Sequence, residues 1–237
     1  MVTKEKKADL LGDLMQMSEE KGDFPPGWLF CMGMTDFGAG HDTMMSALTS
    51  TVACICQRPK VQARVEDEIR AAMKDGILSD PPTYKEISHL EYLHLCIREA
   101  MRCYPIVGSS LARAVPAGGV VIDGYYFPEG TVVGINPYVQ NSNKAIFGED
   151  ADDFRPERWL AAGAEEKREM ERDLAVWGGP SRLCPGQHLA MFIMTKLLVS
   201  LFLKFEISVM LDDQVEMRAY FATHLAGVKA KFILRDA

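Results

Sequence analysis

The 237-residue sequence lacks the features that would assign it to several simple classes of protein. It has no uninterrupted apolar run of about 18 residues, the length that spans a membrane. The closest stretch, from Leu189 to Leu203, is broken by Lys196, so no membrane-spanning helix is expected. The charged N-terminus has no apolar core of a signal peptide. With 26 Lys+Arg against 33 Asp+Glu, the chain lacks the basic excess of a nucleic-acid binder, and no nucleic-acid partner is expected.

Cysteine is also scarce. The six cysteines are too few and too scattered for a disulfide scaffold, and none forms a Cys-x-x-Cys pair typical of a structural zinc site. Most of them are expected to be reduced thiols packed as small apolar groups. The rest of the composition, 48% apolar and 25% charged, is ordinary for a globular protein with one large domain or two small ones.

Apolar periodicity and turn residues predict helices in the first half of the chain, over residues 4–20, 26–57, 60–74 and 84–103. The segment 26–57 contains hardly any charge and is apolar on all sides. A helix of that kind is usually buried, so this segment is predicted to be the central helix of the fold.

The second half of the chain has a different pattern. Short β-branched runs separated by Gly pairs predict a small β-region over residues 112–137. A long irregular stretch follows, from 141 to 183, with a helix near 165–172; loops of that length are uncommon unless they are functional. A helix over 186–203 and a closing β-region over 205–234 complete a mainly α fold with a minor β-region, in one domain.

One cysteine lies in a loop suited to chemistry. Residues 177–186 read Trp-Gly-Gly-Pro-Ser-Arg-Leu-Cys-Pro-Gly and place Cys184 directly before a predicted helix, whose positive end favours the thiolate. Such a thiolate can be the axial ligand of a haem iron. Gly178 and Gly186 let the backbone lie close to a flat macrocycle, and Arg182 can pair with a haem propionate. The alternative is a buried cysteine that follows a loop.

A polar group of residues interrupts the predicted central helix, where residues 39–43 read Ala-Gly-His-Asp-Thr. Gly40 removes a side chain where a ligand can approach, and the Thr43 hydroxyl can bond a preceding carbonyl and loosen the helix. Asp42 adds a carboxylate able to relay protons. The alternative is close helix packing or a bend, and His41 is interpreted as a polar neighbour rather than a metal ligand.

A third pattern concerns Glu99 and Arg102, which share a helix face at i, i+3 and can pair. Most such pairs are exposed and contribute about 0–1 kcal/mol. Residues 154–159, Phe-Arg-Pro-Glu-Arg-Trp, offer a second arginine, Arg158. A glutamate shared by two arginines would fix this loop onto the helix.

Together these patterns resemble the cytochrome P-450 family of haem-thiolate monooxygenases, of the eukaryotic, fungal-like type, over nearly the whole chain. In the resemblance, Cys184 belongs to the haem-ligand loop and residues 39–43 to the oxygen-activation motif. The family's ion-pair triad corresponds to Glu99, Arg102 and Arg158. The implied fold is the α-rich cytochrome P-450 fold, here incomplete, because Met1 corresponds to a point shortly before the central helix and the chain to the C-terminal half.

The resemblance also implies cofactors, partners and further site residues. The cofactor would be haem b (iron protoporphyrin IX) with Cys184 as the axial iron ligand, acting with O2 and with NADPH-derived electrons from an NADPH-dependent flavoprotein reductase. The substrate would be a small organic molecule, in secondary metabolism. Arg113 resembles an arginine that contacts a haem propionate. The substrate pocket would be bordered by Phe37, Ala39, Ile106, Val107, Tyr220 and Phe221.

The family's N-terminal half, with its membrane anchor and the roof of the substrate pocket, has no counterpart in this sequence. The chain is therefore interpreted as a truncated or partial form, or as one half of a two-chain assembly with a missing N-terminal half. Its compartment is undetermined; full-length eukaryotic members lie on the cytosolic face of the endoplasmic reticulum. Two alternatives to a monooxygenase stay open: a non-catalytic haem binder, and an inert fragment or interaction module.

Overall fold

The computed structural model describes residues 9–22, 25–211 and 215–235. The chain divides into two compact units, Met1–Asp42 (unit 1) and Thr43–Ala237 (unit 2). Helix α2 (Pro26–Cys56) contributes its first part to unit 1 and the remainder to unit 2. It confirms the long helix predicted over 26–57, and it includes the glycines at 33, 38 and 40 without interruption.

Unit 1 consists, in its described residues, of α1 (Leu10–Lys21) and the first part of α2. Helix α1 begins where the Asp9 carboxylate accepts a 2.8 Å hydrogen bond from the Gly12 N–H, and it ends at the left-handed Gly22. Residues 4–8 of the helix predicted over 4–20 lie outside the described residues.

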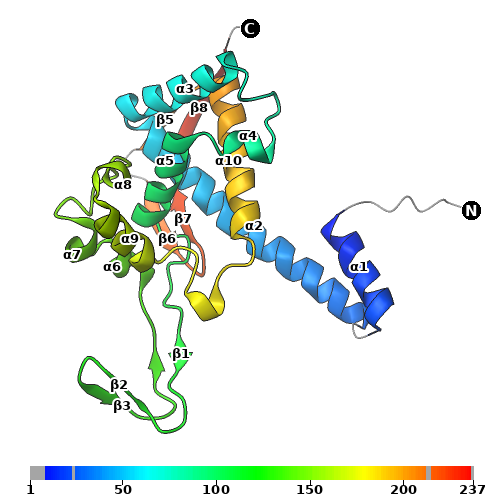
Figure 1. Cartoon of the computed structure of the whole chain (residues 1–237), viewed down its shortest axis with the longest axis vertical. Helices are drawn as coiled ribbons and strands as arrows, with labels where there is room; N and C mark the ends of the chain where they lie inside the picture. The colour runs from blue at the N-terminus through cyan, green and yellow to red at the C-terminus, as the bar shows by residue number, and fades with distance from the viewer. Residues whose placement is uncertain (1–8, 23–24, 212–214, 236–237) are drawn as a thin grey trace, which may run out of the picture. The chain divides into compact units, whose positions relative to one another are not determined.

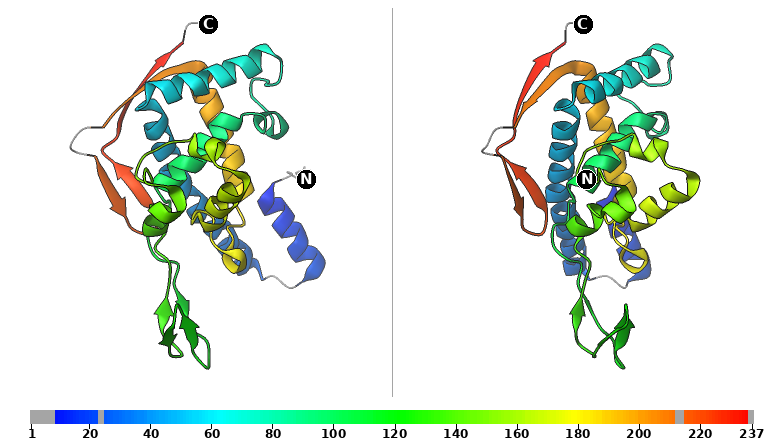
Figure 2. Two further views of the ribbon diagram at one scale, coloured as in Figure 1. Left: turned by 60° about the vertical axis from the view of Figure 1, so that its left-hand side comes forward. Right: turned by 90° about the vertical axis from the view of Figure 1, so that its left-hand side faces the viewer.

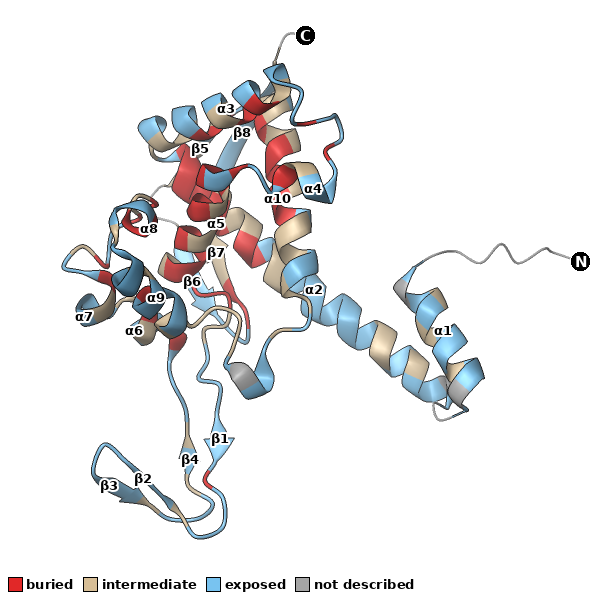
Figure 3. Ribbon diagram, viewed as in Figure 1, coloured by how far each residue is buried: buried red, intermediate tan, exposed pale blue. Residues whose placement is uncertain are grey.

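The burial expected for the central helix is not found in unit 1. Large apolar side chains of α2 are exposed there: Trp28, Phe30, Met34 and Phe37. Burial begins only at Ser46, in unit 2 (Figure 3). An apolar sequence predicts burial only where another element packs on it, and within the described part of unit 1 only α1 accompanies this helix.

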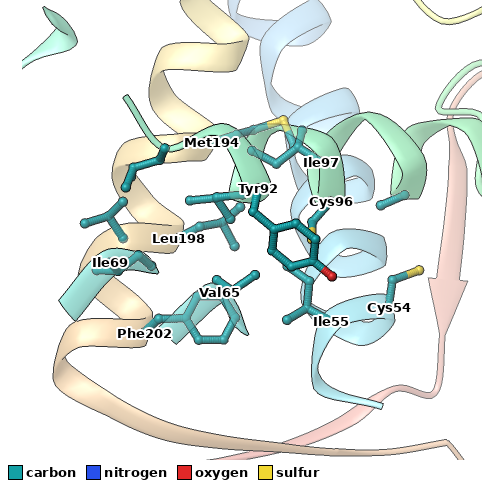
Figure 4. Close-up of a cluster of buried hydrophobic side chains, with 14 of the residues drawn as sticks. Cys54, Ile55, Val65, Ile69, Tyr92, Cys96, Ile97, Met194, Leu198 and Phe202 are labelled. Atoms are coloured by element: carbon teal, nitrogen blue, oxygen red, sulfur yellow. The ribbon is translucent and has the colours of Figure 1, made fainter. Parts of the chain in front are cut away.

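The core of unit 2 lies among four helices: the second part of α2, α3 (Pro59–Lys74), α5 (Glu91–Cys103) and α10 (Gln187–Lys204). Figure 4 shows their apolar side chains meeting, among them Ile55, Val65, Ile69, Ile97, Leu198 and Phe202. Helix α3 contributes buried residues at i, i+4 and i+7, as its amphipathic sequence predicts. Each fully buried side chain of this size stabilises the fold by about 1.5–3 kcal/mol.

The single helix predicted over 84–103 is wrong; the structure has two, α4 (Tyr84–Ile87) and α5. Helix α5 starts afresh because a carboxylate from α3 satisfies its first N–H groups. Glu68 accepts hydrogen bonds from the Tyr92 N–H at 2.7 Å and from the Leu93 N–H at 2.9 Å. A helix start capped from a distant part of the chain has no local sequence signal.

The stretch predicted to be irregular contains short helices, α7 (Lys144–Phe147), α8 (Arg158–Ala161) and η1 (Pro180–Arg182), and a further short helix, α6 (Pro137–Asn141), ends where the stretch begins. The helix predicted near 165–172 is confirmed as α9 (Ala164–Asp173). A second apolar cluster forms beneath these helices around Trp159, Phe147 and Met170. Leu95 of α5 belongs to the same cluster, so the irregular segment packs against α5 through these apolar side chains.

Both predicted β-regions are confirmed as antiparallel hairpins and ribbons. The first contains β1 (Arg113–Ala114) paired with β4 (Val132–Val133), and β2 (Val120–Ile122) paired with β3 (Tyr125–Phe127). The second contains β5 (Phe205–Met210) paired with β8 (Lys229–Leu234), and β6 (Glu216–Ala219) paired with β7 (Thr223–Ala226). Residues 113–135, named the arm below, extend away from the helices of unit 2 (Figures 1 and 2).

Helix α10 departs from the expectation that no segment can span a membrane. In the described residues it is the one helix long and apolar enough to do so by length and composition, despite Lys196. The same helix buries Met194, Leu198 and Phe202 against the core and contacts α3, α4 and β5. Its apolar character is thus accounted for in part by its place in unit 2.

Candidate functional site

The loop that carries Cys184 is closed by a backbone hydrogen bond. The Cys184 N–H donates to the Trp177 carbonyl at 2.8 Å, so the residues between them form a compact turn around η1. Cys184 lies two residues before the N-cap of α10, Gly186, and is half-buried. The helix predicted over 186–203 is confirmed as α10. Its N-terminal end comes directly after the Cys184 loop.

Gly178 is required by this turn. Its φ is +86°, and a Cβ built on it would lie 2.5 Å from the Arg182 carbonyl oxygen. Gly186 is different, because a Cβ there would lie 3.9 Å from Cys184 Sγ, an ordinary contact. The backbone of the loop thus demands glycine at 178 for its own closure.

The other thiols of unit 2 are poor candidates for an anionic ligand. Burial raises the pKa of each, above all for the thiols packed between α2 and α5. They are Cys54, Cys56, Cys96 and Cys103. Among the cysteines of unit 2, Cys184 alone combines partial exposure with a position at a helix start.

The two arginines expected near a propionate are both exposed in unit 2. Arg182 ends η1, two residues before Cys184. Arg113 lies in β1, and its guanidinium donates to the carbonyls of Leu111 at 3.2 Å and Ala112 at 2.9 Å. A ligand with a carboxylate would have to displace those two hydrogen bonds to engage Arg113.

The motif of residues 39–43 lies on α2 at the boundary between the units. Gly40 and Asp42 belong to unit 1, and Thr43 is the first residue of unit 2. A Cβ on Gly40 would meet open space, and the Asp42 carboxylate lies 3.0 Å from His41 Nδ1. His41 is thus a polar neighbour of Asp42, in line with its interpretation from the sequence. The helix is continuous through Thr43.

The structure brings Glu99 and Arg102 of α5 together with Arg158 of the irregular segment. Glu99 and Arg102 are 0% exposed and Arg158 is 3% exposed. The Glu99 carboxylate accepts from Arg102 Nη2 at 2.9 Å and from Arg158 Nε at 2.7 Å. The exposed-pair alternative is thereby excluded, and this glutamate fixes residues 154–159 onto α5.

Two further donors to Glu99 were not foreseen. The Trp159 indole N–H donates to Oε2 at 2.9 Å, and the Arg155 backbone N–H donates to Oε1 at 3.0 Å. With Arg102 Nε at 3.0 Å, the carboxylate accepts five hydrogen bonds in all. A buried carboxylate needs such saturation to remain stable. Of these two donors, only the indole of Trp159 could have been suspected from the sequence, because Trp159 ends the motif of residues 154–159.

The arginines are saturated as well. Arg102 donates to the carbonyls of Asn141, Ala151 and Asp153 at 2.6–3.0 Å. Burial alone would lower the pKa of Arg102, but the hydrogen bonds and charge of Glu99 outweigh it and raise that pKa. Hydrogen bonds from Arg155 and Arg158 lower the pKa of the Asp150 carboxyl despite partial desolvation. Both shifts favour the charged forms of Arg102 and Asp150.

Asn141 links this cluster to the segment that leads into the Cys184 loop. Its side-chain amide is wholly buried, donates to the Ala175 carbonyl at 3.3 Å and accepts from the Ala175 N–H at 2.8 Å. Its own carbonyl accepts from Arg102 at 2.7 Å. Asn141, at the end of α6, thus connects the ion-pair cluster to Ala175, two residues before Trp177. No sequence pattern indicated this role.

Four of the residues expected at a substrate pocket are brought together in unit 2. The Thr223 N–H donates to the Ile106 carbonyl at 2.8 Å, and the Gly108 N–H donates to the Phe221 carbonyl at 3.3 Å. Val107 and Ala222 pair in a β-bridge. The turn that exposes Tyr220 and Phe221 therefore lies against residues 106–108.

Ser46 of α2 adds a contact that the sequence did not reveal, because its hydroxyl donates to the Thr223 carbonyl. This bond fixes the turn to the helix that carries Thr43. The remaining expected pocket residues, Phe37 and Ala39, belong to unit 1, and Phe37 stacks on His41 with ring centroids 5.8 Å apart.

A cavity of about 400 Å³ borders the start of the Cys184 loop. Its lining includes His94, Arg98, Glu171, Trp177 and His188. Arg98 donates to Glu171 at 2.6 Å and lies over the Trp159 ring, 5.1 Å from its centroid. Trp159 therefore links the cavity to the Glu99 cluster, because its ring contacts Arg98 and its N–H donates to Glu99.

Replacing Trp159 with Phe is expected to lower the free energy of unfolding by at least about 1.5–3 kcal/mol, because it removes one hydrogen bond to a buried charged acceptor and also leaves a smaller ring in a fully packed site. Urea denaturation followed by circular dichroism measures the change. The matched control is Trp28→Phe at an exposed position, expected within about 0.5 kcal/mol of the unaltered chain. Equal losses in both variants would contradict a role for the buried indole, with its N–H and its packing, in stability.

Comparison with known proteins assigns this arrangement to a family. A family model described as cytochrome P-450 matches residues 1–232. The chain is 42% identical over 242 residues to the cytochrome P-450 monooxygenase sdnT of Sordaria araneosa, covering 96% of this chain and 43% of the relative. It is 36% identical over 201 residues to pisatin demethylase of Fusarium vanettenii, covering 85% and 38% respectively.

A crystal structure of a cytochrome P-450 shares the fold, with a TM-score of 0.72 at 23% identity over 84% of this chain and 44% of the other. The chain therefore belongs to the cytochrome P-450 family. The relatives named above are fungal proteins, in agreement with the type of member that the motifs resemble. The chain spans less than half the length of each of them.

Proposed function

We propose that this chain is the catalytic part of a haem-thiolate monooxygenase and that Cys184 is the axial ligand of the iron. The observation that carries the proposal is the placement of Cys184. Its thiol is half-buried, at the start of α10, on a loop closed by the Trp177 carbonyl. The thiolate sulfur is a single soft donor, which suits one ligand position of haem iron.

The other residues of the chain support binding of the group. Arg182 and Arg113 supply guanidinium groups for the propionates, since arginine pairs with carboxylates through two parallel hydrogen bonds. Gly178 keeps the loop compact on the side of the cysteine. When bound, a thiolate-ligated haem iron activates O2, and electron donation from the sulfur favours O–O cleavage.

The remaining roles fall to α2 and to the 106–108 and 220–223 segments. Asp42 would hold and deliver protons, Thr43 would orient them with its hydroxyl, and Gly40 would leave room for the small molecules that react. Ile106, Val107, Tyr220 and Phe221 of unit 2 would border the organic substrate. Phe37 and Ala39, of unit 1, stay predicted pocket residues. The apolar character of these residues suits an apolar or aromatic substrate.

The source of electrons and the compartment follow from the same proposal. The described sequence carries no flavin- or dinucleotide-binding loop, because the glycines at 33, 38 and 40 are inside α2. Electrons would come from NADPH through a separate flavoprotein reductase. As part of a longer member of the family, the chain would act on the cytosolic face of the endoplasmic reticulum.

The test is the reduced, CO-bound spectrum of the purified chain after reconstitution with haem. A Soret band displaced to long wavelength is expected, and Cys184→Ser should abolish the displacement. Cys31→Ser is the matched control, because Cys31 is exposed on α2 in unit 1 and has no expected contact with haem.

An unchanged spectrum in the Cys184→Ser variant would overturn the proposal. Absence of haem uptake would favour the interaction-module alternative. Haem uptake with a thiolate spectrum, but without NADPH consumption when a flavoprotein reductase is added, would favour a non-catalytic haem binder.

A further inference from the structure

The turn between β6 and β7, residues 220–222, is held from two sides in unit 2. On one side, residues 106–108 form backbone hydrogen bonds and a β-bridge with the turn and the start of β7. On the other side, the Ser46 hydroxyl of α2 donates to the Thr223 carbonyl. Backbone bonds form with almost any side chain, so the attachment to α2 is the one that depends on the identity of a residue.

The bond from Ser46 lies where water does not replace it. Ser46 and Thr223 are each only 4% exposed. When one partner of a buried hydrogen bond is removed, the other partner loses that bond without compensation from solvent. Loss of the Ser46 hydroxyl would therefore weaken the attachment of the turn to α2.

Gly108 limits the position of the turn from the opposite side. A Cβ built on Gly108 would lie 2.5 Å from Thr223 Oγ1 and 3.1 Å from the Ala219 Cβ. Gly108 does not have a left-handed φ, so the close approach of the hairpin, and not the backbone conformation, demands glycine there. The turn has no room to move toward residues 106–108, while Ser46 keeps it from moving away from α2.

Ser46 is also close to Thr43, to which the proposed function gives a role in proton delivery. The two residues stand at i, i+3 on α2, so they share a helix face and are about 4.5 Å apart along the helix axis. Both belong to unit 2. The turn is therefore attached to α2 one helical turn beyond the residue proposed to act in the reaction.

The turn presents two aromatic side chains. Tyr220 is 74% and Phe221 is 64% exposed, whereas the next residue, Ala222, is 3% exposed. Aromatic rings prefer stacked or edge-to-face contacts with other rings and gain more from them than from area burial alone. Such contacts need a fixed geometry, because ordering a mobile segment on binding reduces the affinity. A turn held from two sides supplies that geometry.

We infer that Ser46 is a positioning residue whose hydroxyl, opposed by Gly108, holds the 220–222 turn in place, and that the turn thereby selects substrates that carry an aromatic ring. The selection of substrates rests on the proposed function. The attachment of the turn by Ser46 requires only the fold of unit 2, so the two parts can fail separately.

The first measurement is amide hydrogen exchange of the whole chain, followed by mass spectrometry. In Ser46→Ala, exchange of residues 219–224 is expected to be about tenfold or more faster, because opening of the turn no longer breaks a buried side-chain bond. The rest of unit 2 should exchange as in the unaltered chain.

The matched control is Ser50→Ala. Ser50 lies one helical turn further along α2 and is 2% exposed, and its hydroxyl donates to the carbonyls of Ser46 and Ala47 within the same helix. The substitution and the burial are thus the same, but the bond that is lost does not reach the turn. Residues 219–224 should exchange in this variant as in the unaltered chain.

The second measurement is ligand selection by the haem-reconstituted chain, with imidazole and 4-phenylimidazole as probes. Both bind haem iron through a ring nitrogen and shift the Soret band, but only 4-phenylimidazole carries an additional aromatic ring. The unaltered chain and Ser50→Ala are expected to prefer 4-phenylimidazole. In Ser46→Ala this preference should fall about tenfold while the affinity for imidazole stays the same. A general loss of stability would weaken both ligands alike.

Equal exchange of residues 219–224 in Ser46→Ala and Ser50→Ala would overturn the positioning role, and so would faster exchange throughout unit 2. An unchanged preference between the two ligands in Ser46→Ala would overturn the selection of aromatic substrates. If the unaltered chain takes up no haem, the proposed function fails and the selection of substrates fails with it. The exchange measurement then still supports or overturns the attachment of the turn by Ser46.

Discussion

Replacing Glu99 with Gln is expected to lower the free energy of unfolding by about 3–5 kcal/mol, the usual effect of breaking a buried ion pair. Arg102 and Arg158 would keep their charges inside the protein while losing the carboxylate that compensates them. Gln also has one oxygen where Glu has two, and the present carboxylate uses both for five donors. Urea denaturation followed by circular dichroism gives the change.

The matched control is Glu171→Gln. It is the same substitution at a residue that also pairs with an arginine, Arg98, but both side chains of that pair are more than a third exposed. Solvent screening limits an exposed pair to about 0–1 kcal/mol. If the two variants unfold at the same urea concentration, burial of the Glu99 cluster does not contribute to stability as the structure implies.

Replacing Gly178 with Ala is expected to destabilise the Cys184 loop by about 1–3 kcal/mol, the range for a non-glycine residue forced into an unfavourable backbone conformation. The left-handed φ of +86° carries part of that energy, and the approach of the new Cβ to the Arg182 carbonyl carries the rest. Because the loop positions Cys184, haem reconstitution should fall together with stability.

Gly179→Ala is the control for this effect. Gly179 is the neighbouring residue, with a φ of −89°, and a Cβ added there would have nothing within 4 Å. It should retain the stability and the CO-bound spectrum of the unaltered chain. A spectrum and a thermal midpoint that are the same for Gly178→Ala as for Gly179→Ala would show that the turn at 178 does not determine the geometry of the loop.

The regular helices of this protein were accessible from sequence because their signals are local. Helices α2, α3, α9 and α10 begin and end within a few residues of the predicted positions, since a Pro or Gly stands at or just before the start of each one. The break between α4 and α5 was not accessible. It depends on Glu68, which belongs to another helix and reaches the first N–H groups of α5 only in the folded chain.

The residues of the candidate site also fall into two groups, those with a local sequence signal and those without one. Cys184 and the pocket segments were predicted from short motifs and from their resemblance to a family. The triad of Glu99, Arg102 and Arg158 was predicted in the same way, and its contacts are observed. The contacts of Trp159, Asn141 and Ser46 were not predicted, because each joins segments that are far apart in sequence. Spacing of residue types within one segment carries no information about such pairs.

The amino-acid sequence by itself determined the family and the positions of most of the main helices, and it predicted the residues proposed to bind haem. Only the tertiary structure decided which charged residues are buried, how Glu99 is saturated, and which apolar surfaces have no cover. The physical reason is that periodicity and turn chemistry act over a few residues, whereas burial and hydrogen-bond saturation depend on segments that meet only after folding. The arm shows this most directly: its strands are apolar on both faces, and they are exposed because the described chain provides nothing to pack against them.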